Sequence, residues 1–230
     1  MGNICSDSWK KTDPETMRDL CDKLLNKGFI ISKNVYNSML EVDRKDFCPY
    51  FPYENRPQSL NYNVTISAPS IHAYCLELLK DYLTAGVKAL DIGFGSGYIT
   101  VALSKMMEDK GLVIGIEHIK ELCDLATENI SKNHKNLLES KKIILIEGDG
   151  RFGYEKYGPY NCIHVGAASE EIPQALIDQL DKGGRLVIPI GNLVQYIYVI
   201  DKDMNGKISK NKKKRVLFVP LTSIEDQLNY

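Results

Sequence analysis

Neither sign of charge is in excess in this 230-residue chain: 29 Lys and Arg residues are balanced by 30 Asp and Glu residues, giving a formal net charge of −1 at pH 7. Nucleic-acid-binding proteins usually carry a basic excess, so the balance argues against a nucleic-acid partner. Cysteines lack the C-x-x-C spacing of zinc and redox sites, which predicts reduced thiols rather than a disulfide framework. They are scattered at Cys5, Cys21, Cys48, Cys75, Cys123 and Cys162.

Long apolar runs are also missing. None reaches the ~18 residues that a membrane-spanning helix needs, and charges throughout the first thirty residues argue against a secretory signal. With the unpaired thiols, these absences predict a cytoplasmic protein. The length and an apolar content of 43 % fit one α/β domain with a single large core. We expect a flexible segment at residues 1–12 and one domain at residues 13–230, present as a monomer.

The first six residues stand apart from this ordinary composition. They fit the N-myristoylation pattern, with Gly2 exposed after removal of Met1 and Ser6 in place. A second acyl chain on Cys5 would decide whether anchoring is stable, because one myristoyl group gives only weak, reversible membrane binding. The alternative is a frayed start to a cytosolic chain, and both interpretations stay open.

Apolar runs alternate with amphipathic stretches from residue 87 onward, which predicts a doubly wound, mostly parallel sheet. Before it, we expect an N-terminal helical cap, with one helix from about Asp13 to Gly28 and a second around Met39. Residues 44–67 lose periodicity and are predicted to be a long functional loop. The remaining expected elements are a helix at 69–82, strands at 87–92, 112–117, 142–147, 161–165 and 184–190, helices at 98–107, 119–133 and 172–180, and a C-terminal antiparallel hairpin of strands 194–200 and 216–221.

A glycine-rich turn follows the first of these strands. Asp91 ends the strand, and Gly93, Gly95 and Gly97 then alternate, with Ser96 between the last two. Glycines there let the backbone turn sharply and approach a ligand at the carboxyl edge of the sheet. Dinucleotide folds need a glycine at position 98, where this chain has tyrosine. The tighter G-x-G-x-G spacing resembles the first motif of methyltransferases that use S-adenosylmethionine.

Acidic residues end the next two strands. Glu117, followed by His118, lies twenty residues beyond the last glycine, where a carboxylate can accept hydrogen bonds from ribose hydroxyls. Asp149 and Gly150 close the third strand and are candidates for the adenine edge, although such clusters are also ordinary turns. Asp91 is a candidate for orienting the glycine loop or the amino end of the ligand, and it also has a local role near a helix start.

Two other stretches imitate known sites. Residues 201–209 match the start of a calcium-binding EF-hand loop, but position twelve is Lys212 rather than glutamate, so a hairpin turn at Asn205-Gly206 is the better interpretation. The run 210–215, with five basic residues in six, is predicted to be a solvated hairpin loop. None of the four histidines has metal-ligand spacing, so we expect no metal.

Segments outside the glycine turn are more specific. T-I-S-A-P at residues 65–69 and H-V-G-A-A at 164–168 resemble the protein-L-isoaspartate (D-aspartate) O-methyltransferase family of repair enzymes. The resemblance covers nearly the whole chain after residue 17. Its further segments are residues 72–74, 113–122, 148–151, 173–180 and 219–222.

The resemblance implies methylation of the α-carboxylate of L-isoaspartyl residues, and less efficiently D-aspartyl residues, in aged proteins, followed by collapse of the ester to a succinimide. It makes Ser67 the active-site serine. The resemblance also implies which residues bind the cofactor in addition to those of the glycine turn. They are Val64, Thr65, Ile66, Ser67, His72, Glu117, His118, Asp149, Gly150, Thr222 and Gln227. Ser67, Gly166, Ala167 and Ala168 would bind the substrate. Departures from the family are Phe94 in the glycine turn, glutamate rather than aspartate at 117, and the loop 47–55.

Carboxylate methylation also explains why no nucleophile–base pair stands out. A carboxylate with a pKa near ~4 is already ionised at neutral pH, so the protein need only position it and replace its solvent. Ser67 is suited to that role, with a helix N-cap as its alternative. Rival functions are methylation of a small molecule or nucleic acid, a non-catalytic membrane-tethered protein, and a nicotinamide oxidoreductase, which Tyr98 opposes.

Overall fold

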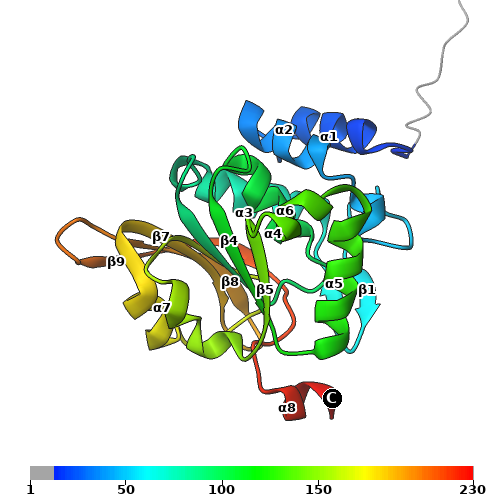
Figure 1. Cartoon of the computed structure of the whole chain (residues 1–230). Helices are drawn as coiled ribbons and strands as arrows, with labels where there is room; N and C mark the ends of the chain where they lie inside the picture. The colour runs from blue at the N-terminus through cyan, green and yellow to red at the C-terminus, as the bar shows by residue number, and fades with distance from the viewer. Residues whose placement is uncertain (1–12, 230) are drawn as a thin grey trace, which may run out of the picture.

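The computed structural model describes residues 13–229. Its main feature is a seven-stranded sheet of order β5-β4-β3-β6-β7-β8-β9, in which β5 to β7 are parallel and β8 and β9 are antiparallel (Figure 1). This confirms the doubly wound, mostly parallel sheet. The strands are β3 (Lys88–Ile92), β4 (Leu112–Glu117), β5 (Ile143–Glu147), β6 (Tyr160–Val165), β7 (Leu180–Ile190), β8 (Gln195–Lys202) and β9 (Ile208–Val216).

Both faces of the central strands β3, β4 and β6 are buried, which is why these strands read as continuous apolar runs. Within β6, Cys162 packs into the core cluster on one face and Ile163 into the cluster on the other. The strand order reverses at β3, because β4 and β5 lie to one side of it and β6 and β7 to the other. Open α/β sheets bind ligands at such a switch point.

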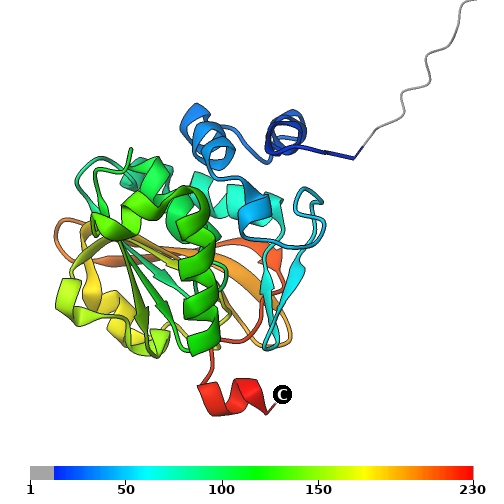
Figure 2. The same ribbon diagram turned by 45° about the vertical axis from the view of Figure 1, so that its right-hand side comes forward.

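Helices cover both faces, and α1 and α2 form the expected cap above α3 and α4 (Figures 1 and 2). The first helix starts later than expected. Thr16, not Asp13, is the N-cap of α1, and its side chain and that of Asp19 form a capping box. The helices are α1 (Met17–Asn26), α2 (Lys33–Glu41), α3 (Pro69–Leu79), α4 (Tyr98–Met106), α5 (Lys120–Asn133), α6 (Lys135–Glu139), α7 (Gln174–Gln179) and α8 (Ile224–Leu228), with short 3₁₀ turns η1 (Arg44–Asp46), η2 (Lys80–Tyr82), η3 (Gly150–Phe152) and η4 (Glu155–Tyr157).

The predicted loop at 44–67 contains structure that the sequence pattern did not reveal. Besides η1, it holds a two-stranded antiparallel sheet of β1 (Gln58–Asn61) and β2 (Val64–Ile66). The β strands are three and four residues long, too short for a periodic pattern to stand out. Their effect is to bring residues 64–67 to the switch point of the large sheet.

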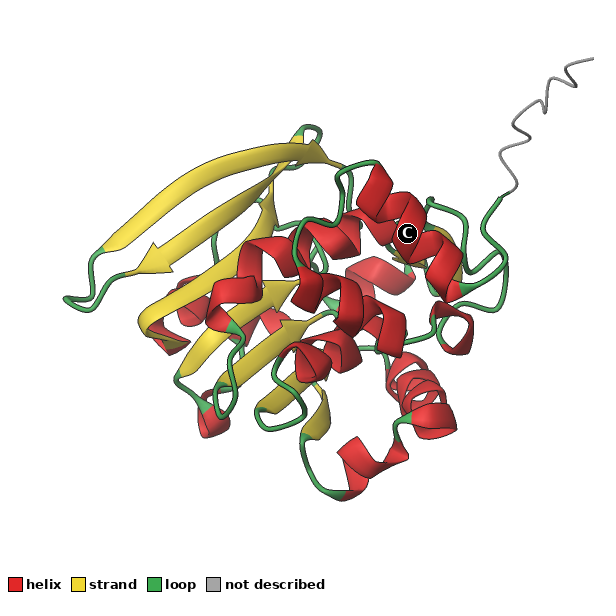
Figure 3. Cartoon of the chain, turned by 90° about the horizontal axis from the view of Figure 1, so that it is seen from above, coloured by secondary structure: helices red, strands yellow, loops and turns green. Residues whose placement is uncertain are grey.

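The C-terminal hairpin is present, but its second strand was placed wrongly. The predicted strand at 216–221 is wrong, because β9 covers Ile208–Val216 and pairs with β8 along the sheet edge. A tight turn causes this: the Asp203 carboxylate accepts hydrogen bonds from the backbone N–H groups of Asn205 and Lys207, so pairing resumes at once. The hairpin turn at Asn205-Gly206 is thereby confirmed. The basic run lies in an edge strand, not in a loop, and long strands are visible along one side of the molecule in Figure 3.

The acylation signal at Gly2 and Cys5 lies outside the described residues. Within residues 13–229, no helix is long and apolar enough to cross a membrane.

Candidate active site

The carboxyl ends of β3, β4 and β6 meet around a cleft. Backbone hydrogen bonds fix its walls: the Gly93 N–H donates to Ile116 O, and the Gly166 N–H donates to Ile92 O, both at 2.8 Å. A cavity opens there whose empty volume, part of it open to solvent, is about 520 Å³. Two further cavities adjoin it, and Thr65 and Gly166 line all three. We refer to them as the first, second and third cavities.

Glycine is required at two points of this cleft for different reasons. Gly97 has φ +85°, and a Cβ there would lie 3.2 Å from Ala126 and Ile130 of α5. Gly166 has ordinary φ, but a Cβ would lie 2.8 Å from the Gly93 carbonyl oxygen. Gly97 therefore serves the turn and its packing on α5, whereas Gly166 allows two strand ends to approach closely.

Glu117 lies in the wall of the first cavity and is only 5 % exposed. Its carboxylate accepts hydrogen bonds from the N–H groups of His118 at 2.9 Å, and of Gly95 and Ile119 at 3.2 Å. Burial raises the pKa of Glu117 above its ordinary value, and these three donors counteract the shift. A carboxylate has about four acceptor positions, so room remains for at least one ligand hydroxyl.

Asp149 and Gly150 lie at the next strand end, in the same cavity. The Arg151 guanidinium holds the Asp149 carboxylate, with its Nη2 2.6 Å from Oδ2. Burial acts to raise the pKa of Asp149, but the hydrogen bonds from Arg151 outweigh it, so the pKa lies below its ordinary value. Asp149 therefore presents a fixed, charged carboxylate edge beside the cavity.

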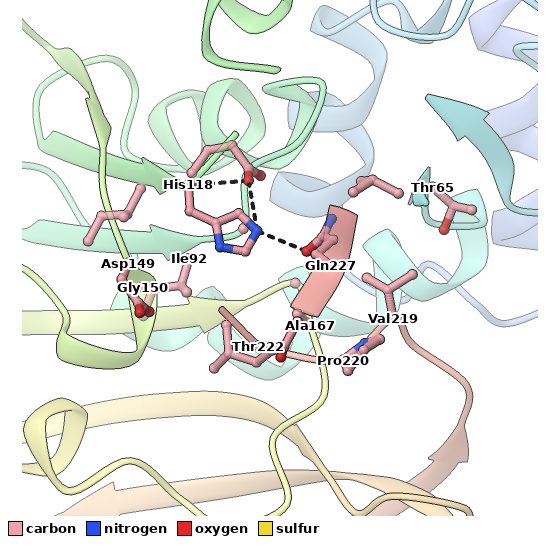
Figure 4. Close-up of a pocket in the computed structure, with 16 residues that line it drawn as sticks. Thr65, Ile92, His118, Asp149, Gly150, Ala167, Val219, Pro220, Thr222 and Gln227 are labelled. Carbon is pink, nitrogen blue, oxygen red and sulfur yellow. Dashed lines mark hydrogen bonds and ion pairs between the residues drawn. The ribbon is translucent and has the colours of Figure 1, made fainter. Parts of the chain in front are cut away.

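A C-terminal segment closes the first cavity from the opposite side. Figure 4 shows Gln227, from α8, pointing toward His118. The His118 Nε2 lies 2.8 Å from the Gln227 side-chain oxygen, and the Gln227 side-chain N–H donates to the Tyr62 carbonyl at 3.1 Å. Thr222 lines the same cavity. Hydrogen bonds of Gln227 thus connect α8 with His118 and Tyr62 across the mouth of the first cavity.

A buried ion pair lies beneath the second cavity. The Asp91 carboxylate accepts a 2.6 Å hydrogen bond from the Thr100 hydroxyl, and its other oxygen lies 2.8 Å from His164 Nδ1. Burial opposes the charged form of His164, but hydrogen bonds with Asp91 and Cys75 outweigh it and raise its pKa to about 10. His164 is therefore cationic at neutral pH, and Asp91 is held in one orientation.

His72 lines the same cavity, but unlike His164 its imidazole is neutral at neutral pH. Burial, and then the charges of Arg44 and His164, hold its pKa well below the ordinary value. Its ring stacks on Tyr98 with centroids 4.9 Å apart. The Arg44 guanidinium, fully buried, reaches His72 Nδ1 at 3.3 Å and donates to the Ser67 carbonyl oxygen at 2.8 Å.

The third cavity opens beside Ser67. Its walls come from Ser67 and Ala68, from Ile71 on α3, and from the segment 216–219 that follows β9. The N-cap of α3 is Ala68, so the alternative role of Ser67 as the helix cap is wrong. Within residues 13–229 the Ser67 hydroxyl has no hydrogen-bond partner, and it lies between the second and third cavities.

The predicted site residues are almost all gathered around these cavities, although their binding roles stay predictions. Among the cofactor candidates, Gly97 does not line a cavity. Among the substrate candidates, Ala167 lines only the first cavity, and Ala168 lines none, although its N–H donates to Val219 O at 2.8 Å. First-cavity candidates are Val64, Thr65, Gly93, Glu117, His118, Asp149, Gly150, Thr222 and Gln227, and second-cavity candidates are Ile66, Ser67, His72, Asp91, Gly95 and Ser96.

Some residues of the site were missed or left without a role. Arg44 was not singled out at all, and His164 was noted only as part of a resembling segment. Phe94, the departure in the glycine turn, lines the second cavity, and a Cβ at Gly115 would lie 2.8 Å from its ring. Its ring thus packs where Gly115 leaves space. Within residues 13–229, no group of three or more His, Cys, Asp or Glu residues is placed to hold a metal ion.

The chain is similar in sequence to known proteins over nearly its whole length. The family model "Protein-L-isoaspartate(D-aspartate) O-methyltransferase (PCMT)" matches residues 15–226. The chain is 47 % identical over 226 residues to protein-L-isoaspartate O-methyltransferase of Caenorhabditis elegans, covering 96 % of this chain and 99 % of that protein. It is 43 % identical to protein-L-isoaspartate O-methyltransferase 1 of Arabidopsis thaliana, covering 96 % and 97 %.

A solved structure extends the similarity to three dimensions. It is a putative protein-L-isoaspartate O-methyltransferase of Plasmodium falciparum in complex with S-adenosyl-L-homocysteine. The TM-score is 0.86 at 35 % identity, covering 91 % of this chain and 99 % of that one.

Proposed function

The chain belongs to the protein-L-isoaspartate (D-aspartate) O-methyltransferase family, and from this we propose that it methylates the α-carboxylate of L-isoaspartyl residues in damaged proteins. D-aspartyl residues are poorer substrates of the same reaction. S-adenosylmethionine is the methyl donor and S-adenosylhomocysteine the product. The methyl ester then collapses to a succinimide, whose hydrolysis returns part of the damaged residue to normal aspartate.

The joining of the three cavities at Thr65 and Gly166 is the observation that carries this proposal. Two carboxylates, Glu117 and Asp149, line the first cavity, which suits a cationic nucleoside cofactor. The third has a serine hydroxyl and an apolar wall of residues 216–219, with no carboxylate among its lining residues. An anionic peptide group can enter from that side and meet the cofactor at Ser67.

The residues around the first two cavities fit S-adenosylmethionine. Glu117 keeps acceptor capacity for a ribose hydroxyl, and Asp149 and Gly150 border the adenine position. Asp91, with both carboxylate oxygens engaged by Thr100 and His164, orients the glycine loop at the amino-acid end. When bound, this cofactor supplies an electrophilic methyl group on a sulfonium sulfur. Gln227 and Thr222 cover it from the C-terminal side.

The chain's own contribution is positioning and exclusion of water. Because the substrate carboxylate is already ionised at neutral pH, no general base is needed. The Ser67 hydroxyl is free to donate to one carboxylate oxygen, leaving the other as the nucleophile. Burial of the site replaces the carboxylate's water with this donor and nearby N–H groups.

Domain organisation and location are part of the same proposal. Residues 13–230 form one catalytic domain that works as a cytoplasmic monomer on isoaspartyl proteins, with no nucleic-acid partner. The Gly2 acylation signal remains an alternative that would add weak membrane association.

A pair of peptides tests the activity. One carries a single isoaspartyl residue, and its twin has normal aspartate at that position. With labelled S-adenosylmethionine, we expect base-labile label only in the isoaspartyl peptide. Equal labelling of both peptides, or labelling of neither, would contradict the proposed function.

A further inference from the structure

A run of positively charged residues lies along β9, at the edge of the large sheet. Every residue from Ile208 to Arg215 is exposed. We call the cluster Lys210, Lys212, Lys213, Lys214 and Arg215 the basic strip. It carries five positive charges on a chain whose net charge is −1, so the rest of the chain sums to −6.

The basic strip is not neutralised by neighbouring carboxylates. Within residues 13–229, none of its five cations takes part in an ion pair, whereas lysines on the helices often do, as with Lys105 and Asp109 at 2.6 Å. The ammonium groups of Lys210, Lys212 and Lys214 lie over aromatic rings instead. Lys212 Nζ is 3.5 Å from the Tyr196 ring centroid, and Lys214 Nζ is 5.6 Å from that of Tyr74. Such contacts hold the side chains without cancelling their charge.

The basic strip runs directly into the third cavity. Val216 ends β9 and lines that cavity, as do the three residues after it, and Lys214 is only two residues away. Tyr74, which Lys214 contacts, is on α3 one turn beyond Ile71, another lining residue. At ~3.3 Å per residue, positions 210 to 215 extend over roughly 17 Å of strand. That length matches about five residues of extended peptide.

We infer that the basic strip selects isoaspartyl sites lying in acidic sequence segments, by attracting the residues that flank the damaged position. This inference rests on the proposed function, since it assigns the third cavity to the substrate. Attraction follows from charge complementarity and from the continuity of β9 with the cavity wall. A basic segment would be repelled by the same charges.

Edge strands also carry lysine simply to prevent edge-to-edge aggregation, so the test must separate the two roles. In the charge-reversal variant Lys213→Glu/Arg215→Glu, the edge still bears five charges that oppose aggregation, but its net charge falls from +5 to +1. A neutral variant replaces all five cations by Gln. Its matched control replaces five exposed lysines elsewhere by Gln, namely Lys27, Lys110, Lys135, Lys141 and Lys182.

The substrates are isoaspartyl peptides of one length with three Glu, three Gln or three Lys on either side of the damaged residue. For the unmodified chain and the control, we expect kcat/KM to be about tenfold higher for Glu-flanked than for Lys-flanked peptides on at least one side, mostly through KM. The neutral variant should lose this ratio to within about twofold, and the charge-reversal variant, whose strip keeps a net charge of +1, should lower it. Raising the salt to about 0.5 M should shrink the ratio, because screening shortens the range of the attraction.

Three results would overturn the inference: no dependence on flanking charge in the unmodified chain, the same ratio in the neutral variant, or an equal loss in the control. In each case the Gln-flanked isoaspartyl peptide would still be methylated. Failure of the proposed function looks different, because then no isoaspartyl peptide would be labelled. Light scattering on each variant reports aggregation separately.

Discussion

The Arg44 guanidinium donates a 2.8 Å hydrogen bond to the carbonyl oxygen of Ser67. The arginine is fully buried, its Nε has no partner, and no carboxylate within residues 13–229 pairs with it. A buried cation without a counter-ion is costly, so it is rarely kept for stability alone. Here it fixes the backbone of the residue that separates the second and third cavities.

Replacing Arg44 by Met should therefore impair activity more than folding. Losing a charged hydrogen bond of about 1.5–3 kcal/mol at the Ser67 carbonyl should lower kcat/KM roughly tenfold to a hundredfold. Loss of the desolvation penalty offsets the lost bonds, so the free energy of unfolding should change by less than about 2 kcal/mol. Arg44→Lys keeps the charge and should recover part of the activity. Urea unfolding and steady-state kinetics measure both quantities, and a loss of stability that parallels the loss of activity would refute a positioning role.

Ser67→Ala tests the hydroxyl itself. The side chain makes no hydrogen bond within the described residues and does not cap α3, so its removal should leave the fold intact. We expect turnover to fall roughly tenfold or more, because one donor to the carboxylate is lost, while S-adenosylhomocysteine affinity stays within about twofold. Calorimetry gives the affinity and single-turnover assays give the rate. Equal losses in both would show that Ser67 serves the cofactor.

Glu117→Gln removes the charge that the first cavity presents to a ribose. The S-adenosylhomocysteine Kd should rise about tenfold or more, since a charge-assisted hydrogen bond is worth about 1.5–3 kcal/mol. Glu117→Asp keeps the carboxylate and serves as the control, with a smaller rise expected. Calorimetry at pH 7.5 measures both. Unchanged affinity in Glu117→Gln would remove Glu117 from the cofactor site.

The buried pair of His164 and Asp91 predicts a pH dependence of stability. The pKa of His164 is raised to about 10 in the folded protein, against about 6.5 when unfolded. The folded state thus binds the proton more tightly, and this contribution is complete below about pH 6.5 and is lost as the pH rises toward 10. His164→Gln should remove it. The difference in free energy of unfolding between the two proteins should shrink from pH 6 to pH 10, and a constant difference would mean that His164 is buried neutral.

The parallel strands were predictable because burial on both faces leaves an unbroken apolar run, as at residues 87–92 and 112–117. Strand β9 has no such pattern, since all of Ile208–Arg215 is exposed. Its position follows from the Asp203 turn and from pairing with β8. Hydropathy alone therefore favoured the apolar residues after 216, which in fact line a cavity.

The same distinction applies to the site. Glu117 and Asp149 could be assigned because Glu117 ends β4 and Asp149 comes two residues after β5, and strand ends of a parallel sheet converge. Arg44 could not, because its contacts with Ser67 and His72 are 23 and 28 residues away in sequence and depend on how η1 packs. His164 lies inside a strand, and its partner Asp91 is 73 residues away. Such contacts leave no local signal.

Gln227 offers a test of the C-terminal closure. Its side chain bonds to both His118 and the Tyr62 carbonyl, so Gln227→Ala removes two hydrogen bonds across the mouth of the first cavity. At about 0.5–1.5 kcal/mol each, their loss should weaken S-adenosylhomocysteine binding roughly tenfold, mainly through faster dissociation, because α8 opens more readily. Leu228→Ala, at an exposed position on the same helix, controls for general loosening of α8 and should bind normally. Stopped-flow dissociation rates distinguish the two, and equal rates in both variants would mean that α8 does not retain the cofactor.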